Sequence, residues 1–133
     1  MNPRAIGYGI AGGVALVVLQ LLIAFAAPLE KYPAIVRYVV SANQLLSILA
    51  YAIAGWIAGR VAQQRGAAHG FLAGLGTAIA GRLLLIGVIV LREGFDAANG
   101  LIGPPLQLAL WLAMGAAIAT GGGVLGAQFK KAD

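Results

Sequence analysis

The chain has 133 residues, of which 61% are hydrophobic and only 10% are charged, against about 25% charged in typical soluble domains. Cysteine is absent and there is one histidine, so the composition excludes disulfides and thiolate metal sites and favours no metal or other cofactor. The net charge of +5 does not predict nucleic-acid binding, because the basic residues lie at the ends of apolar runs, where anionic lipid headgroups account for them.

Four apolar runs fill almost the whole chain, at about residues 5–27, 34–59, 70–91 and 106–129. Each run is longer than the roughly 20 residues that a helix needs to cross about 30 Å of hydrocarbon. Lipid offers no hydrogen-bond partners, so a spanning segment must satisfy its own backbone as a helix. The sequence therefore predicts an all-α fold, a single transmembrane domain built as a bundle of four spanning helices.

The first run has a second interpretation, a cleaved signal peptide, because Ala24-Phe25-Ala26 resembles a small-x-small cleavage site. A signal core has about 7–15 apolar residues, and this run is longer. We therefore expect the first run to be retained as a spanning helix.

Three polar connections separate the runs. The first contains Glu30 and Lys31 between two prolines, which end a helix. The second is the turn at residues 63–66, and the third, residues 92–105, is the longest. Four crossings place both termini and the second connection on one side of the membrane.

The distribution of charge predicts the orientation. The side with the termini carries five basic residues against one acid, whereas the basic residues of the other side are offset by as many acids. The positive-inside rule therefore predicts that both termini are cytoplasmic. We expect the membrane itself to be a bacterial inner membrane. The basic residues expected to contact lipid headgroups are Arg60, Arg65, Lys130 and Lys131.

Small residues recur at spacings of four in every run. Lipid tails are as apolar as leucine, so helices associate in a bilayer through close backbone approach at such residues rather than through hydrophobicity. This pattern predicts a tight bundle with little room for a wide pore. The glycines expected at helix contacts are Gly9, Gly13, Gly55, Gly59, Gly74, Gly115 and Gly123.

Arg82 is the most informative single residue. It lies about nine residues from the far end of the third run, where insertion of an arginine costs about 2.5–3.5 kcal/mol. Asn43 and Gln44 of the second run fall at nearly the same depth, and Gln20 of the first run is slightly nearer the surface. The sequence thus predicts an intramembrane polar layer formed by these four residues.

Three interpretations of Arg82 remain open. It could donate to the amide oxygens of Asn43, Gln44 or Gln20 and so fix the register of the helices. It could instead hold an outside anion, such as a lipid phosphate, a carboxylate of a partner subunit or a small solute, because a guanidinium binds such groups in a bidentate manner. It could also line a path for a transported anion or proton.

Two further features predict no chemistry. Gly7-Tyr8-Gly9-Ile10-Ala11-Gly12 matches the dinucleotide-binding pattern G-x-G-x-x-G, but no strand can precede it, and a membrane helix follows. His69 lies at the start of the third run with no carboxylate nearby in sequence, and both catalysis and pH sensing need such a partner. We expect no catalytic residue and no metal site.

The stretch Ala54-Gly55-Trp56-Ile57-Ala58-Gly59-Arg60, followed by Gly66, His69-Gly70, Gly74 and Gly76, resembles a recurrent pattern. It is similar to small four-helix bacterial membrane proteins catalogued as families of unknown function, in which a glycine-rich helix ends in Ala-Gly-Arg and a His-Gly pair opens the next. Ala67-Ala68 stand where an aromatic residue often precedes that pair. The resemblance implies four spans and no known enzymatic activity.

These observations predict a non-enzymatic accessory or assembly subunit that docks on a larger membrane complex. The expected partners are membrane lipids and other integral membrane subunits, with a homo-oligomer possible and nucleic acid excluded. The alternative is a homo-oligomeric transporter or channel for a small solute or ion, which would use the polar layer around Arg82.

Overall fold

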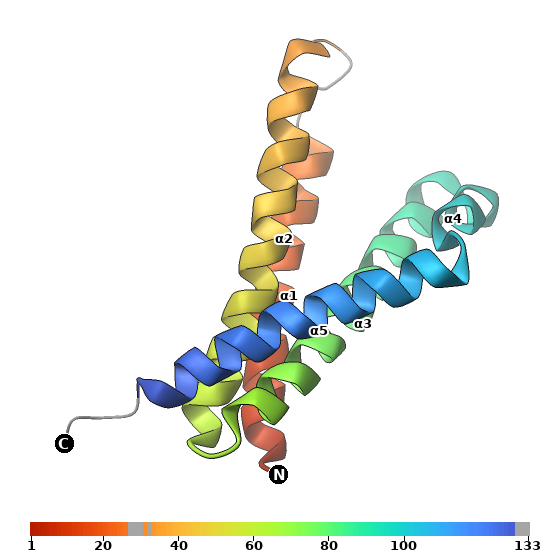
Figure 1. Cartoon of the computed structure of the whole chain (residues 1–133). Coiled ribbons are helices and arrows are strands. Elements are labelled where there is room, and N and C mark those ends of the chain that lie inside the picture. The colour runs from red at the N-terminus through yellow and green to blue at the C-terminus, as the bar shows by residue number, and fades with distance from the viewer. Residues whose placement is uncertain (27–30, 32, 130–133) are drawn as a thin grey trace.

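The computed structural model describes residues 1–26, 31 and 33–129, and all its regular elements within these ranges are helices. They are, in order, α1 (Pro3–Ala26), α2 (Pro33–Ala62), α3 (Gly66–Glu93), α4 (Phe95–Ile102) and α5 (Pro105–Gln128) (Figure 1). Four of them, α1, α2, α3 and α5, are long and apolar enough to cross a membrane. The structure confirms the predicted all-α fold with four long apolar helices, which is the pattern of a multi-pass membrane protein.

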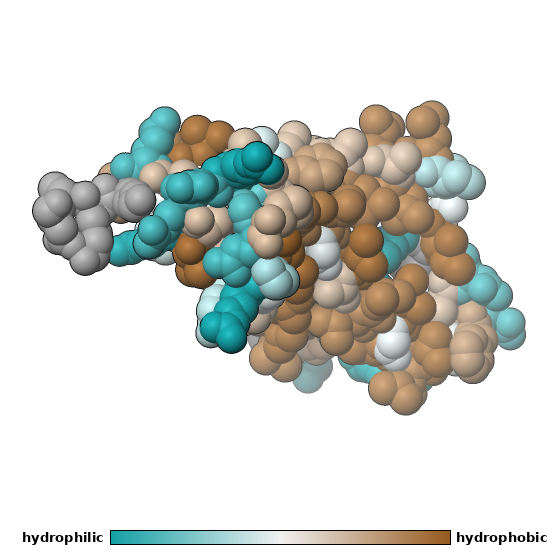
Figure 2. All heavy atoms as spheres, turned by 90° about the horizontal axis from the view of Figure 1, so that it is seen from below, coloured by the Kyte–Doolittle hydropathy of each residue, from teal (hydrophilic) through white to brown (hydrophobic). Residues whose placement is uncertain are grey.

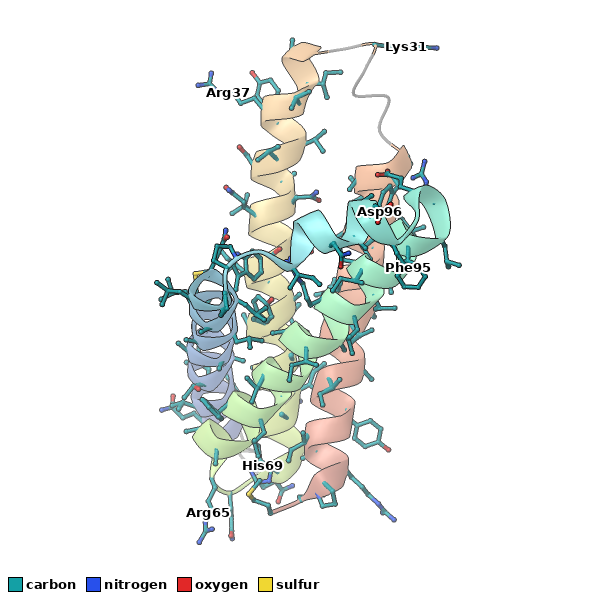
Figure 3. All side chains as sticks on the ribbon, turned by 90° about the vertical axis from the view of Figure 1, so that its right-hand side faces the viewer. Lys31, Arg37, Arg65, His69, Phe95 and Asp96 are labelled. Carbon is teal, nitrogen blue, oxygen red and sulfur yellow. The ribbon has the colours of Figure 1, made fainter. Side chains whose placement is uncertain are left out.

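The short helix α4 is an addition to the prediction, which treats residues 92–105 as a connection. Gly94 and Gly103 flank α4 with φ angles of +90° and +64°, a region that glycine adopts without a steric penalty. Asp96 lies in its first turn, where a carboxylate is favourable next to the helix dipole. Ala98 is buried, so α4 packs on the rest of the molecule and bridges the ends of α3 and α5 (Figure 3).

Helices α2 and α3 form the central pair of the bundle. Both contact α1 and both contact α5, so α1 and α5 lie on opposite sides of that pair (Figure 3). Helix α1 begins at the same end of the molecule as the turn between α2 and α3, and α5 ends there (Figure 1). We call this end the terminal end and the opposite one the distal end.

The helices meet through very small side chains. Alanine dominates the buried core, and the largest fully buried side chain among the described residues is Thr77. A Cβ added at Gly55 would collide with the carbonyl oxygen of Ala119, and one added at Gly59 would collide with that of Gly123. The contact between α2 and α5 is therefore backbone against backbone, as expected where lipid replaces water.

The spacing of the contact residues explains the shape of the bundle. They form rows with a period of four, for example Gly55 and Gly59 on α2 and Gly115, Ala119 and Gly123 on α5. Rows of this kind are inclined by about 26° to the helix axis, so helices packed along them cross at about 50°. Because the small residues lie toward the terminal end, α2 and α5 are close there and diverge toward the distal end (Figure 1).

The outer surface is mostly apolar. Large hydrophobic side chains such as Leu22, Leu45 and Leu83 are more than half exposed. Figure 2, which views the terminal end, shows hydrophilic side chains gathered beside this apolar surface. Charged side chains also mark the distal end, where Lys31 and Arg37 lie (Figure 3). The arrangement of polar ends and apolar sides suits a molecule that spans a membrane.

Candidate functional site

A cavity of about 410 Å³ occupies the distal half of the bundle, where the helices diverge. Side chains from α1, α2, α3 and α5 line it, together with Gly100 and Ile102 of α4 and the adjoining Gly103. Its volume lies within the usual range for small-molecule sites, which are mostly apolar and carry a few polar groups. The period-four rows account for its position, because the lining begins where the small contact residues end.

A hydrogen-bonded group joins α1 and α2 at one wall of the cavity. The Nε2 of Gln20 donates to the hydroxyl of Ser47 at 2.8 Å and to the carbonyl oxygen of Asn43 at 3.2 Å. The hydroxyl of Ser47 donates to the same carbonyl at 3.1 Å. These bonds hold the Gln20 side chain across the helix interface, so this wall is fixed.

Arg82 contributes the charge of the cavity. It follows Ala78 by one helical turn on α3, and both residues line the cavity with Gly81 and Leu85. Of the described side chains in the lining, that of Arg82 alone is charged. Arg82 is partly buried and faces the interior rather than the outer surface of the bundle, so the cavity carries one cationic side chain among apolar, amide and hydroxyl side chains.

Tyr51 and Trp111 form an aromatic wall between α2 and α5. Their ring centroids are 6.5 Å apart with an interplanar angle of 69°, the edge-to-face geometry that aromatic pairs favour. Gly115 admits the Tyr51 ring, since a Cβ there would lie 3.0 Å from the ring carbons. Tyr51 is only 6% exposed, whereas Trp111 is 47% exposed, so the wall runs from the interior to the surface.

The structure brings together part of the predicted polar layer. Arg82 and Gln20 both line the cavity, and Asn43 joins Gln20 through its backbone. The Asn43 Oδ1 is buried and accepts no hydrogen bond from the described residues, so a bond from Arg82 to this atom, one of the alternatives considered for Arg82, is not made. Gln44 is exposed and lies outside the lining, because adjacent residues of a helix point about 100° apart.

The predicted packing and headgroup residues lie as follows. All seven packing glycines are buried, and each faces a neighbouring helix at a distance that leaves no free space for a Cβ. Arg60 and Arg65 are exposed at the terminal end, with the guanidinium carbon of Arg60 5.0 Å from the centre of the Trp56 ring. Lys130 and Lys131 lie outside the described residues.

His69 has a role that sequence reasoning missed. It is 3% exposed, and its Nε2 accepts a hydrogen bond from the backbone N–H of Asn2 at 3.0 Å. Its Nδ1 lies 3.0 Å from the carbonyl oxygen of Arg65, and Figure 3 shows both labelled residues beside the beginning of α1. His69 thus connects α1 to the turn between α2 and α3.

Sequence reasoning also missed Ser47 and Tyr51 as parts of the site. A signal was present, because Asn43, Ser47, Tyr51 and Gly55 are spaced by four and share one face of α2. Along that face, polar residues at the distal end give way to glycine at the terminal end. This change from polar residues to glycine along α2 indicates where the helix diverges from the helices packed against it.

The described residues contain no group of three histidine, aspartate or glutamate side chains that could hold a metal ion. No family model, curated protein or solved structure matches the chain. The resemblance to four-helix membrane families therefore stays a prediction, and the function is argued from the residues themselves.

Proposed function

We propose that the chain is a non-enzymatic accessory or assembly subunit of a bacterial inner membrane, which docks on a larger integral membrane complex through the distal face of α2. Gln44 carries the proposal. It is exposed, makes no hydrogen bond with the described residues, and lies among the exposed apolar side chains Val40, Leu45 and Ile48.

The depth of Gln44 supports this role. It is 16 positions from Arg60, which corresponds to about 24 Å along a helix, less than the roughly 30 Å of hydrocarbon. An amide at this depth has no hydrogen-bond partner in lipid, and a polar side chain from another helix supplies one worth about 0.6–2 kcal/mol.

Neighbouring residues make the same face of α2 more polar than a lipid-facing surface needs to be. Arg37, Ser41 and Gln44 lie three or four positions apart and are all exposed. The hydroxyl of Ser41 donates to the carbonyl oxygen of Arg37 at 3.0 Å and is thus satisfied within α2. The side-chain amide of Gln44, by contrast, has no hydrogen-bond partner among the described residues. A partner helix with an amide, hydroxyl or carboxyl group at that level would supply one.

The experiment places a photoreactive benzophenone amino acid at position 44 in cells that produce the native complex. We expect a cross-link to a different integral membrane protein, and the same partner should be lost from mild-detergent preparations of the Gln44→Leu variant. The matched control carries the benzophenone at Leu22, which is 62% exposed on α1, and should give no protein adduct. Adducts of the chain with itself alone, or equal adducts at both positions, would contradict the proposal.

A homo-oligomeric transporter is the second candidate, and the cationic distal cavity favours it. Flux of an anion into liposomes that is lost in Arg82→Ala would support it. The terminal half of the bundle stands against it, since the backbones at Gly59, Gly66 and Gly123 touch and leave no continuous path between these helices.

A further inference from the structure

We propose that the distal cavity is a binding site for the anionic head group of one membrane amphiphile, a fatty acid or an anionic phospholipid, with Arg82 holding its carboxylate or phosphate. This inference concerns the interior of the bundle and is independent of the docking face on α2. It follows from the charge, the lining and the opening of the cavity.

The positive charge of Arg82 favours an anionic ligand in the cavity. A guanidinium carries five N–H donors in a planar fork, so it can hold a neighbour within the protein and still present donors to a ligand. The described lining contains no carboxylate that would compete for those donors. Carboxylates and phosphates are the groups that match this fork in a bidentate manner.

The remaining lining selects an amphiphile over a small inorganic anion. Around Arg82 lie apolar side chains from three helices, among them Val17 and Leu21 of α1 and Leu112 of α5. Such walls stabilise a hydrocarbon chain but contribute nothing to binding a solvated ion. A molecule with one anionic group and an acyl chain satisfies both parts of the cavity.

A second polar side chain is available to the head group. Tyr51 lines the cavity at 6% exposure, and its hydroxyl makes no hydrogen bond with the described residues, although the ring is held against Trp111. The hydroxyl is therefore available to donate a hydrogen bond to a ligand oxygen in the cavity.

The cavity reaches the outer surface of the bundle beside α4. Ile102, Gln107 and Trp111 line the cavity and are also exposed, so they mark its opening. The distal halves of α2 and α5 diverge at this end of the bundle (Figure 1). An acyl chain would leave past Ile102 and Trp111 into the surrounding lipid, while the amide of Gln107 lies at the rim.

Trp111 provides the reporter for the experiment. The chain has two tryptophans, and Trp56→Phe leaves Trp111 as the single tryptophan, whose fluorescence can be excited selectively. The protein is placed in nanodiscs of unbrominated phosphatidylcholine and titrated separately with brominated oleate, brominated phosphatidylglycerol and brominated phosphatidylcholine. We expect saturable quenching by one or both anionic probes at mole fractions where the zwitterionic probe quenches only in proportion to its concentration.

The variants identify the group that binds. Arg82→Gln should raise the half-saturation of the anionic probe by about tenfold or more, as expected for loss of a charge-assisted hydrogen bond. Tyr51→Phe, which keeps the ring, should raise it by about threefold or more. Arg92→Gln removes one exposed charge from the same helix and should leave it unchanged. Should Arg82→Gln fail to fold by circular dichroism, Arg82→Lys and Tyr51→Phe decide the matter.

Each outcome bears on the proposal. Saturation by oleate alone assigns a fatty acid, and saturation by phosphatidylglycerol alone assigns a phospholipid. Complete displacement of either probe by millimolar inorganic phosphate would show that a small anion is sufficient for binding. That result would overturn the proposal that the ligand is an amphiphile. Equal quenching by the zwitterionic probe, or an Arg82→Gln and a Tyr51→Phe variant that both bind as the parent does, would overturn the site.

Discussion

The two hydrogen bonds of the His69 ring determine which ring nitrogen carries the proton of the neutral side chain. Its Nε2 accepts the backbone N–H of Asn2, so that nitrogen carries no hydrogen. The proton of a neutral ring must then be on Nδ1, which lies 3.0 Å from the carbonyl oxygen of Arg65 and donates to it. A single tautomer of neutral histidine therefore satisfies two backbone groups at the terminal end.

We predict that His69→Ala lowers the free energy of unfolding by about 0.5–1.5 kcal/mol, because it removes the acceptor of the Asn2 N–H and the second donor to the carbonyl oxygen of Arg65. His69→Gln should recover part of this loss, since its amide oxygen can reach the position of Nε2. Thermal unfolding in detergent, followed by circular dichroism, measures both effects. Hydrogen exchange at residues 2–6 should accelerate in the alanine variant, and unchanged exchange there would rule out the connection.

The polar layer shows what depth counting predicts and what it omits. Counting along each helix places Gln20 slightly nearer the surface than Arg82, and both line the cavity. It cannot distinguish Asn43 from Gln44, because two adjacent residues differ little in depth but point in different directions around the helix. The period-four face of α2 carries that missing information, and it also identifies Ser47 and Tyr51.

At the scale of the element, three consecutive glycines in α5 have three different surroundings. Gly121 is exposed, and a Cβ there would have nothing within 4 Å. A Cβ at Gly122 would collide with the carbonyl oxygen of Ala52, and one at Gly123 with that of Gly66. The run is therefore a contact surface on two sides of α5 and open on the third.

We predict that Gly122→Ala and Gly123→Ala each lower the free energy of unfolding by about 1–3 kcal/mol, because the new methyl group must push two backbones apart. Gly121→Ala is the matched control, and it should raise stability by about 0.5–1 kcal/mol, since alanine is the better helix former. Thermal unfolding in the same detergent compares the three. A uniform effect across them would mean that helix propensity, not packing, governs this segment.

The boundaries of the elements show where local signals compete. The third run is predicted from residue 70, yet α3 begins at Gly66, because Ala67 and Ala68 suit a helix and the backbone N–H of His69 bonds to Arg65. The length of an apolar run reflects the thickness of the hydrocarbon layer, whereas a helix continues until its backbone hydrogen bonding is interrupted. Helix α4 has eight residues, too few for periodicity to reveal, and its flanking glycines are visible in sequence only as turn signals.

At the scale of the molecule, one packing rule produces both the contact and the cavity. Small residues in inclined rows draw α2, α3 and α5 together near the terminal end, and the same inclination separates α2 and α5 toward the distal end (Figure 1). The sequence predicts the tight half directly. The distal cavity is harder to foresee, because it depends on the crossing angle and on the placement of α4, which are properties of the assembled bundle.

The proposed orientation leads to a prediction that uses the absence of cysteine, since single-cysteine variants then report one position each. Gln64 lies in the exposed turn between α2 and α3 at the terminal end, and Asn99 is exposed on α4 at the distal end. With cytoplasmic termini, a membrane-impermeant maleimide added to spheroplasts should label Asn99→Cys and spare Gln64→Cys until the membrane is opened.

Lys31→Cys is the independent check, because Lys31 belongs to the first connection and is exposed at the distal end (Figure 3). It should be labelled together with Asn99→Cys, since an even number of crossings separates the two positions. Labelling of Gln64→Cys alone would reverse the orientation and with it the basis for a positively charged cytoplasmic face. Labelling of Lys31→Cys and Asn99→Cys from opposite sides would remove one of the four spans, because α2 and α3 could not then both cross the bilayer.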